Sequence, residues 1–428
     1  MCRGRVVAAL AAAVLAVPVG GVLGQPPAEA GLRAGQAAVV PCPKPDVPPP
    51  PGRPKRPVPP ADDPALMAVG GKALATRGLI VPTGARKPPA VSARSWLVAD
   101  LDTGQVLGGC GPHVYGTPAS VQKLLLAATV LPKLDPKKVT TVTRKDLQFE
   151  PGSSAVGLVE GGRYSVRTLW LGLLLNSGND AANVLARLGG GADGVPGTVA
   201  AMNAEAHRLG AFQTHAVTPS GLDGPGPFTS AYDLALIARA CFDQPAFRSY
   251  ALTRNTQIPA QPPRTKRGFQ IQNENKLIYN YRGALGGKTG FTTLARHSYV
   301  GAAERDGRRL VVTLLGAEAY PQRGWKQGAA LLDWGFALPR SASVGQLVPP
   351  ADDSPDTAAD AMPLGAAAPS ARPVPHGSRP APIATMSVGI AATVAVVLAA
   401  APMALLMSAR RRRIRRRVRR HRAGPQWS

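Results

Sequence analysis

The sequence is poor in cysteine, histidine and acidic side chains. It has four cysteines and six histidines among 428 residues. No Cys-x-x-Cys pair and no clustered pair of histidines occurs in it, so the sequence indicates no metal site, and we expect no cofactor. Acidic residues number 25 against 50 basic ones, which gives a formal net charge of +25. This large positive charge needs an explanation.

The excess of positive charge is concentrated near the C-terminus. Ten arginines lie between residues 410 and 422, directly after an uncharged stretch at 383–409. That stretch is long enough for one membrane-spanning helix, and basic residues beside a span stay on its cytoplasmic side. We therefore predict a transmembrane helix at 383–409 and a cytoplasmic tail at 410–428. Because the charge has this simpler explanation, nucleic-acid binding is not expected.

The N-terminus has the three parts of a secretory signal peptide. Arg3 and Arg5 form a short basic region, Val6–Val17 is apolar, and residues 28–30 (Ala-Glu-Ala) offer a small-x-small cleavage site. We predict a signal peptide over 1–30. The chain between the signal and the span then lies outside the cell, attached to the cell membrane by a single pass.

Three cysteines remain after the signal peptide, in an oxidising compartment. Cys42 and Cys110 lie in loop-like sequence, whereas Cys241 lies on an apolar helical stretch and is expected to be a buried thiol. One disulfide and one free thiol agree with this number. The sequence leaves open which two cysteines pair.

Proline-rich and small-residue stretches flank a part of the chain with the composition of a folded domain. Residues 31–90 are predicted to be a linker or N-terminal extension, extended through the prolines of 41–64. Residues 346–382 are rich in alanine and proline and are predicted to be a second linker. The folded domain is expected at 91–345.

Sequence patterns place strands at both ends of this domain and helices in its middle. Two strands joined by an Asp-Thr-Gly turn are predicted within 96–107, and a third strand at 283–289. A hairpin around 305–307 joins strands at 298–303 and 310–315. Helices are predicted at 166–175, 180–188, 199–209, 230–242 and 328–334. This order indicates an α+β domain whose sheet is closed by the two chain ends.

Three short polar motifs occur at the expected ends of elements. They are Ser120–Lys123 (Ser-x-x-Lys), Ser177–Asn179 (Ser-x-Asn) and Lys288–Gly290 (Lys-Thr-Gly). Each alone is weak, since a Ser-x-x-Lys is expected by chance roughly once in a chain of this length. Their order and their contexts, a helix start, a break between helices and a strand end, argue against coincidence.

The position of a lysine in an apolar helix indicates which reaction these motifs could carry out. Lys123 precedes the hydrophobic stretch Leu124–Val130, and a buried amine is costly unless it is paired or neutral. The alternative is that Lys123 reaches the surface along its flexible stem. Ser120 lies one turn earlier, with Thr117 as the expected N-cap and Pro118 as the first helical residue. A neutral lysine beside a serine hydroxyl supplies a base and a nucleophile for acyl transfer.

This combination of motifs resembles the serine D-alanyl-D-alanine carboxypeptidases, the low-molecular-mass penicillin-binding proteins. The resemblance covers about Ser95 to Phe336, nearly all of the folded part. It implies a penicillin-binding-protein and β-lactamase-like transpeptidase fold, with an antiparallel sheet flanked by helices and a helical subdomain, and makes 91–345 the catalytic domain. The segments that carry it are 118–123, 177–183, 220–224, 228–235, 275–277, 287–292, 306–310 and 331–336.

The resemblance implies three catalytic residues and a substrate. Ser120 is acylated by the penultimate D-alanine carbonyl of a peptidoglycan stem peptide. Lys123 is the base, and Ser177 relays a proton toward the leaving amine. Water then releases the shortened stem, and β-lactam antibiotics act as inhibitors that mimic the substrate and trap Ser120.

The resemblance also implies a set of substrate-binding residues. The backbone N–H groups of Ser120 and Phe291 form an oxyanion hole, and Arg323 lies near the terminal carboxylate of the substrate. A solvated charge at a helix start is the other reading of Arg323. The whole set is Asn179, Lys288, Thr289, Gly290, Phe291 and Arg323.

The sequence departs from the family pattern at one place beside the third motif. Residues 294–297 (Leu-Ala-Arg-His) stand where family members often have Ala-Gly, so the resemblance does not define the pocket beside this strand. The β-rich domain that follows the catalytic domain in some relatives has no counterpart after Phe336.

The same scaffold also serves other functions. A β-lactamase is disfavoured because the chain has no Glu-x-x-Leu-Asn segment, which a class A enzyme uses for deacylation. DD-endopeptidase or transpeptidase activity is compatible with the same motifs. A non-catalytic wall-binding protein is disfavoured because all three motifs are intact.

Overall fold

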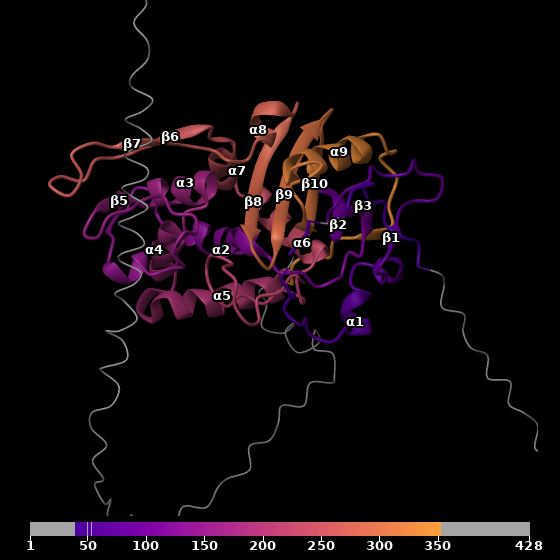
Figure 1. Cartoon of the computed structure of the whole chain (residues 1–428), viewed down its shortest axis with the longest axis horizontal. Helices are drawn as coiled ribbons and strands as arrows, with labels where there is room; N and C mark the ends of the chain where they lie inside the picture. The colour runs from indigo at the N-terminus through magenta and orange to yellow at the C-terminus, as the bar shows by residue number, and fades with distance from the viewer. Residues whose placement is uncertain (1–38, 49, 53, 352–428) are drawn as a thin grey trace, which may run out of the picture. The chain divides into compact units, whose positions relative to one another are not determined.

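Residues 39–48, 50–52 and 54–351 are described by the computed structural model of the chain (Figure 1). The predicted signal peptide, the predicted span at 383–409 and the arginine-rich tail lie outside these residues, as does most of the second linker. Among the described helices, none is long and apolar enough to cross a membrane.

A seven-stranded antiparallel sheet forms the centre of the fold (Figure 1). Its strands run in the order β1-β3-β2-β10-β9-β8, and β11 pairs with β3. Because β2 from the start of the domain pairs with β10 from its end, the predicted α+β domain with a sheet closed by both chain ends is confirmed. The strands are β1 Leu79–Ile80, β2 Ser95–Asp100, β3 Gln105–Cys110, β8 Ala284–Thr292, β9 Arg296–Arg305, β10 Arg308–Ala317 and β11 Gly345–Gln346.

Helices cover both faces of this sheet. Helix α9 (Gly324–Phe336) packs on one face and α6 (Ala231–Asp243) on the other. Since successive residues of a strand point to opposite faces, Trp96 and Val98 of β2 join the apolar cluster under α9, and Leu97 joins the cluster under α6. Both faces are therefore apolar, which explains why β2 is buried along its whole length.

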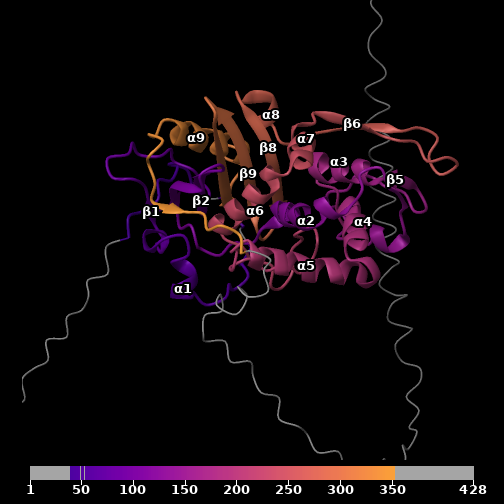
Figure 2. The ribbon, with the colours of Figure 1, turned by 180° about the vertical axis from the view of Figure 1, so that it is seen from behind.

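A helical region lies beside β8, the edge strand of the sheet (Figure 2). Every residue of α2 (Lys123–Val130) is buried, because α4, α5 and α6 pack around it. The other helices are α1 Pro64–Met67, α3 Val166–Asn176, α4 Asn179–Gly189, α5 Gly194–Arg208, α7 Pro245–Leu252 and α8 Leu277–Asn280. Two small antiparallel sheets pair β4 (Val139–Thr141) with β5 (Arg163–Ser165) and β6 (Asn255–Ile258) with β7 (Phe269–Gln272).

The proline-rich N-terminal extension is attached to the domain. It has no helix or strand in its described part before α1, but a disulfide joins Cys42 to Cys110, and the Leu79 N–H donates to the Val40 carbonyl over 2.8 Å. Cys110 is the last residue of β3, so its placement in a loop was wrong. The prediction that Cys241 is a buried free thiol is confirmed.

Removal of this disulfide is expected to destabilise the domain. The bond closes a loop of 68 residues, and the entropy of closing such a loop in the unfolded chain corresponds to about 4 kcal/mol. The double variant Cys42→Ser/Cys110→Ser should lose a stability of that order in chemical denaturation. An unchanged denaturation midpoint would show that the disulfide adds nothing to the stability of the folded domain.

Candidate active site

Ser120 lies in a tight turn that precedes α2. Residues Ala119–Gln122 form a 3-10 turn (η2), and no side chain caps its N-terminus, so the prediction of Thr117 as an N-cap was wrong. Ala119 has a φ of 51°, in the left-handed region. The turn is pressed against Gly221, where an added Cβ would lie 2.0 Å from the Ala119 carbonyl oxygen. This contact shapes the backbone that presents the serine.

The amine of Lys123 is fully buried beneath this turn. Its Nζ lies 2.8 Å from Ser120 Oγ, 2.8 Å from Asn179 Oδ1 and 3.1 Å from the Ser220 carbonyl oxygen. Burial, followed by the positive charge of Lys288, holds the pKa of Lys123 well below its usual range. A neutral amine has two hydrogens and one lone pair, which match two oxygen acceptors and one hydroxyl donor. The site therefore suits an uncharged Lys123 that accepts the Ser120 proton.

A second buried lysine holds the serine of the second motif. Ser177 ends α3 with a φ of 59°, and this left-handed residue turns the chain into α4. Lys288 Nζ lies 3.0 Å from Ser177 Oγ and donates to the Thr289 carbonyl over 2.7 Å. Burial lowers the pKa of Lys288 to about 8. The Ser177 hydroxyl is thus aligned by a cation at neutral pH.

A loop at residues 152–158 completes the wall around Asn179. Asn179 Nδ2 donates to Ser153 Oγ over 2.9 Å, which fixes the side-chain amide already bonded to Lys123. The buried Asp180 carboxylate accepts three backbone N–H groups from Val156, Gly157 and Leu158 at 2.9–3.0 Å. Sequence reasoning gave neither Ser153 nor Asp180 a role. A carboxylate directly after a Ser-x-Asn motif was an available signal for Asp180, whereas nothing marked Ser153.

The edge strand β8 lies against the nucleophile turn. An added Cβ at Gly290 would lie 2.9 Å from the Ser120 backbone nitrogen and 3.0 Å from that of Val121. Only a glycine lets the strand approach this closely. Phe291 follows it and is about half exposed. The strand therefore presents its free edge to any molecule that reaches Ser120.

The predicted residues surround one cleft of about 950 Å³ between the sheet and the helical region. Ser120, Ser177 and Asn179 line one wall, and Thr289, Gly290 and Phe291 line another. Lys123 and Lys288 are buried behind these walls. Arg323, at the start of α9, also lines the cleft and is exposed there. The structure thus brings all nine predicted site residues together, and they are Ser120, Lys123, Ser177, Asn179, Lys288, Thr289, Gly290, Phe291 and Arg323.

Comparisons with known proteins agree with this geometry. A family model described as D-alanyl-D-alanine carboxypeptidase matches residues 83–319, more than half of the chain. The chain belongs to the D-alanyl-D-alanine carboxypeptidase family. The resemblance inferred from the three motifs is therefore confirmed.

Relatives in this carboxypeptidase family cover the catalytic domain. The D-alanyl-D-alanine carboxypeptidase DacB2 of Mycobacterium tuberculosis is 45% identical over 63% of this chain and 90% of the relative. DacD of Salmonella typhimurium is 37% identical over 59% of this chain, which spans 64% of that protein.

Solved structures show the same fold. A D-alanyl-D-alanine carboxypeptidase from Mycobacterium tuberculosis is 44% identical, with a TM-score of 0.57 over 62% of this chain and 99% of its own. A Streptomyces DD-transpeptidase is 26% identical, with a TM-score of 0.56 over 59% of this chain and 100% of its own. The expected penicillin-binding-protein fold is thus confirmed.

The turn between β8 and β9, where the sequence departs from the family pattern, has its own set of contacts. Arg296 forms an ion pair of 2.9 Å with the buried Glu318 carboxylate, and the Leu294 N–H donates to Asp223 Oδ2 over 3.1 Å. His297 lines the cleft with its ring centroid 4.7 Å from that of Phe291. Sequence reasoning did not place His297 in the carboxypeptidase cleft.

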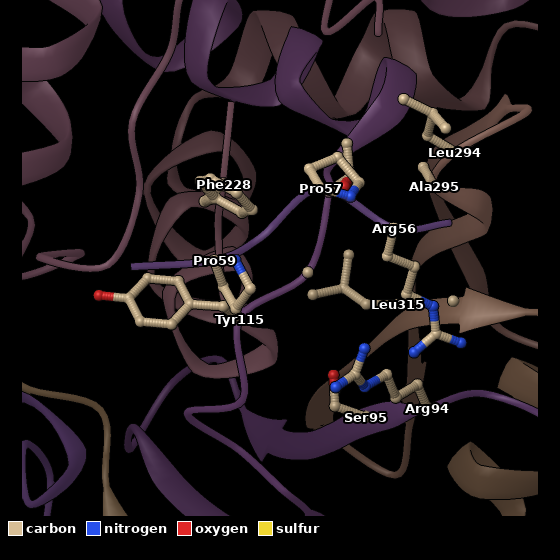
Figure 3. A pocket seen from close by; sticks show the side chains of 13 residues that line it. Arg56, Pro57, Pro59, Arg94, Ser95, Tyr115, Phe228, Leu294, Ala295 and Leu315 are labelled. Carbon is tan, nitrogen blue, oxygen red and sulfur yellow. The ribbon is translucent and has the colours of Figure 1, made fainter. Parts of the chain in front are cut away.

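A second, smaller pocket lies behind this turn (Figure 3). Its volume is about 40 Å³, and Pro57 and Pro59 from the N-terminal extension line it together with Phe228 and Leu315. The extension therefore packs against residues next to the carboxypeptidase site. In the part of the chain that the structure describes, no group of three His, Cys, Asp or Glu side chains is placed to hold a metal ion.

Substitution of Gly290 by alanine is expected to slow acylation by penicillin. The new methyl group would push β8 away from the Ser120 turn, and displacing one oxyanion-hole donor costs roughly 100–1,000-fold in rate. Gly224→Ala is the matched control, because an added Cβ there meets no atom within 4 Å. The rate of labelling by a fluorescent penicillin measures both. Equal rates for Gly290→Ala and the unmodified protein would show that β8 does not hold the oxyanion hole.

Proposed function

We propose that this chain removes the C-terminal D-alanine from peptidoglycan stem peptides through an acyl-enzyme on Ser120. The observation that carries the proposal is the fully buried Lys123 amine, 2.8 Å from Ser120 Oγ, in a chain of the carboxypeptidase family. A buried lysine without a carboxylate partner is costly, and general base chemistry explains why it is present.

Acylation begins with proton transfer from Ser120 to the neutral amine of Lys123. The freed oxygen attacks the carbonyl carbon of the penultimate D-alanine, and the carbonyl oxygen becomes an oxyanion. The backbone N–H groups of Ser120 and Phe291 stabilise this charge. Their preorganisation is supported by the close packing of Gly290 on the Ser120 turn.

Expulsion of D-alanine requires a proton on the leaving nitrogen. Ser177 relays it: the Ser177 hydroxyl gives its proton to the nitrogen and takes one from the Lys288 ammonium, whose Nζ lies 3.0 Å from Ser177 Oγ. Ser177 lines the same cleft as Ser120, and Lys288 is buried behind it. The oxygen of Asn179 is engaged by Lys123, and its side chain positions the substrate amide. Thr289 and Arg323 bind the terminal carboxylate. Water then hydrolyses the ester, and Lys123 returns its proton to the Ser120 oxygen, which regenerates the nucleophile.

Acyl transfer to an amine acceptor is the second candidate function. It is favoured by the Streptomyces structure of the same fold, which is a DD-transpeptidase. Both reactions share the acyl-enzyme and differ only in whether water or an amine attacks it. β-Lactams form the same ester, so their acylation of Ser120 reports on the first half-reaction of either function.

We further propose that the catalytic domain acts outside the cell, on the surface of the membrane. The predicted signal peptide at 1–30, span at 383–409 and tail at 410–428 support this location. The disulfide between Cys42 and Cys110 also supports it, because disulfides persist in oxidising compartments.

Release of D-alanine from a synthetic stem ending in D-Ala-D-Ala tests the proposed reaction. The full-length protein should release D-alanine, and Ser120→Ala should release none, because it lacks the nucleophile. Ser249→Ala, an exposed serine on α7, is the matched control and should keep the full rate. Release by Ser120→Ala at the unmodified rate would exclude the proposed acyl-enzyme.

Titration of the two buried lysines should affect the acylation rate in opposite ways as the pH rises. Lys123 must be neutral, so the rate rises as pH increases through its lowered pKa. Lys288 must be charged to align Ser177, so the rate falls above about pH 8, where its pKa lies. Stopped-flow acylation by a chromogenic β-lactam gives the profile. Lys288→Arg keeps its charge and should lose the alkaline decline, whereas an unchanged decline would assign it to another group.

A further inference from the structure

The hairpin of β6 and β7 carries exposed basic side chains at its tip. Arg264, Lys266 and Arg267 lie in the connection between the two strands, and all three are exposed. Figure 1 shows the hairpin projecting past α3 and β5, away from the central sheet. The catalytic steps described above use none of these residues.

The tip of the hairpin is joined to a second basic segment. The Arg163 N–H donates to Gln261 Oε1 over 2.7 Å, and Gln261 Nε2 donates to the Arg163 carbonyl over 2.9 Å. The Gly161 N–H donates to the Val142 carbonyl over 2.8 Å, so the chain just before β5 lies beside the chain that leads into the 3-10 turn η4 (Arg144–Leu147).

These contacts bring three segments with exposed cations near one another, and we call this group of segments the basic ledge. Its six exposed cations belong to the hairpin tip, β5 and η4. None of the six forms an ion pair with another described residue. The exposed carboxylates in the connection from β4 to β5 are those of Glu150 and Glu160, so acidic side chains there are fewer than the six cations. The ledge therefore keeps a net positive charge. Its members are Arg144, Lys145, Arg163, Arg264, Lys266 and Arg267.

The ledge is continuous with the catalytic cleft through β7. Gln270 and Gln272 of this strand line the cleft. A strand rises about 3.3 Å per residue, so Arg267 lies within roughly 17 Å of Gln272 along the hairpin. Phe269 lies between them and is 41% exposed, which offers an apolar surface for the face of a sugar ring. A long molecule that leaves the cleft along this hairpin meets the ledge.

We propose that the basic ledge binds polymeric peptidoglycan next to the stem that enters the cleft. The inference rests on the proposed function, because the ligand of the ledge is inferred from the substrate proposed for the cleft. Each uncleaved stem ends in a carboxylate, so a glycan strand with several stems is a polyanion. Six cations on one surface attract such a polymer much more than a single peptide, because the contacts act together.

A membrane surface fits the ledge less well. Its position beside the cleft and its connection to the cleft-lining strand β7 point to the substrate polymer. The ledge is therefore an accessory binding surface that raises the local concentration of stems. The ledge leaves the chemistry at Ser120 unchanged, so the rate of D-alanine release from short soluble peptides should not depend on it.

Charge reversal at the hairpin tip tests this assignment in the full-length protein. We compare Lys266→Glu/Arg267→Glu with Arg86→Glu/Lys87→Glu, an equal change in an exposed loop beside Trp334 of α9. The tip variant should need roughly fivefold more purified sacculi to reach half its maximal rate of D-alanine release, because exposed charges contribute modestly and add up. It should keep the unmodified kcat/KM on a short D-Ala-D-Ala peptide, and the control should keep both values.

Loss of activity on both substrates by the tip variant would overturn the proposal, because it would mean damage to the cleft itself. Equal activity of the tip variant and the unmodified protein on sacculi would also overturn it.

A binding assay separates this proposal from the proposed function. Cosedimentation with sacculi needs no turnover, so it reports on the ledge even in a Ser120→Ala background. The tip variant should cosediment less than the control at low salt, and the difference should disappear near 0.5 M salt as charges are screened. If the tip variant instead lost binding only to phosphatidylglycerol vesicles and kept binding to sacculi, the ledge would belong to lipid and the proposal would be wrong.

Discussion

The structure depends on keeping an amine without charge inside an apolar helix bundle. Burying an ammonium ion without a partner is prohibitive, so the fold must provide Lys123 with partners that suit a neutral nitrogen. It does so with one hydroxyl and two oxygen acceptors, which come from η2, α4 and the segment after α5. The fully buried α2 excludes water from the Lys123 amine, which lowers its pKa. The positive charge of the buried Lys288 lowers the pKa of Lys123 further. The packing that buries Lys123 is therefore also what keeps its amine neutral and able to act as a base.

The cleft exists because β8 is an edge strand. Its inner neighbour β9 satisfies one side of its backbone, and the other side faces the turn that carries Ser120. An extended peptide is recognised naturally by such an edge, because backbone groups that have no strand partner are available to it. The glycine at 290 allows the close approach, while the left-handed Ser177 places the second hydroxyl on the opposite wall.

Short-range signals predicted most of the elements and the catalytic motifs. The strands around the Asp-Thr-Gly turn, the hairpin at 305–307 and the helix of Lys123 all have local patterns, and the structure contains them. Thr117 is not the N-cap, because the chain enters α2 through the turn η2, whose backbone lies against Gly221, far away in the sequence. The partner of Cys110, the loop that holds Asn179 and the β6–β7 hairpin likewise depend on distant residues. Local propensity carries no information about such contacts.

The pairing of β2 with β10 has a consequence for when the protein becomes active. Arg308 bonds to Asp100 across 208 residues, so the sheet closes only after nearly the whole domain has been synthesised. Ser120 emerges early, but Asn179, Ser220 and Lys288 follow it in the chain and the last of them belongs to the edge strand. A nascent chain therefore carries its nucleophile without a working base. The ability to hydrolyse a substrate is therefore acquired only after the complete domain has been synthesised and has folded.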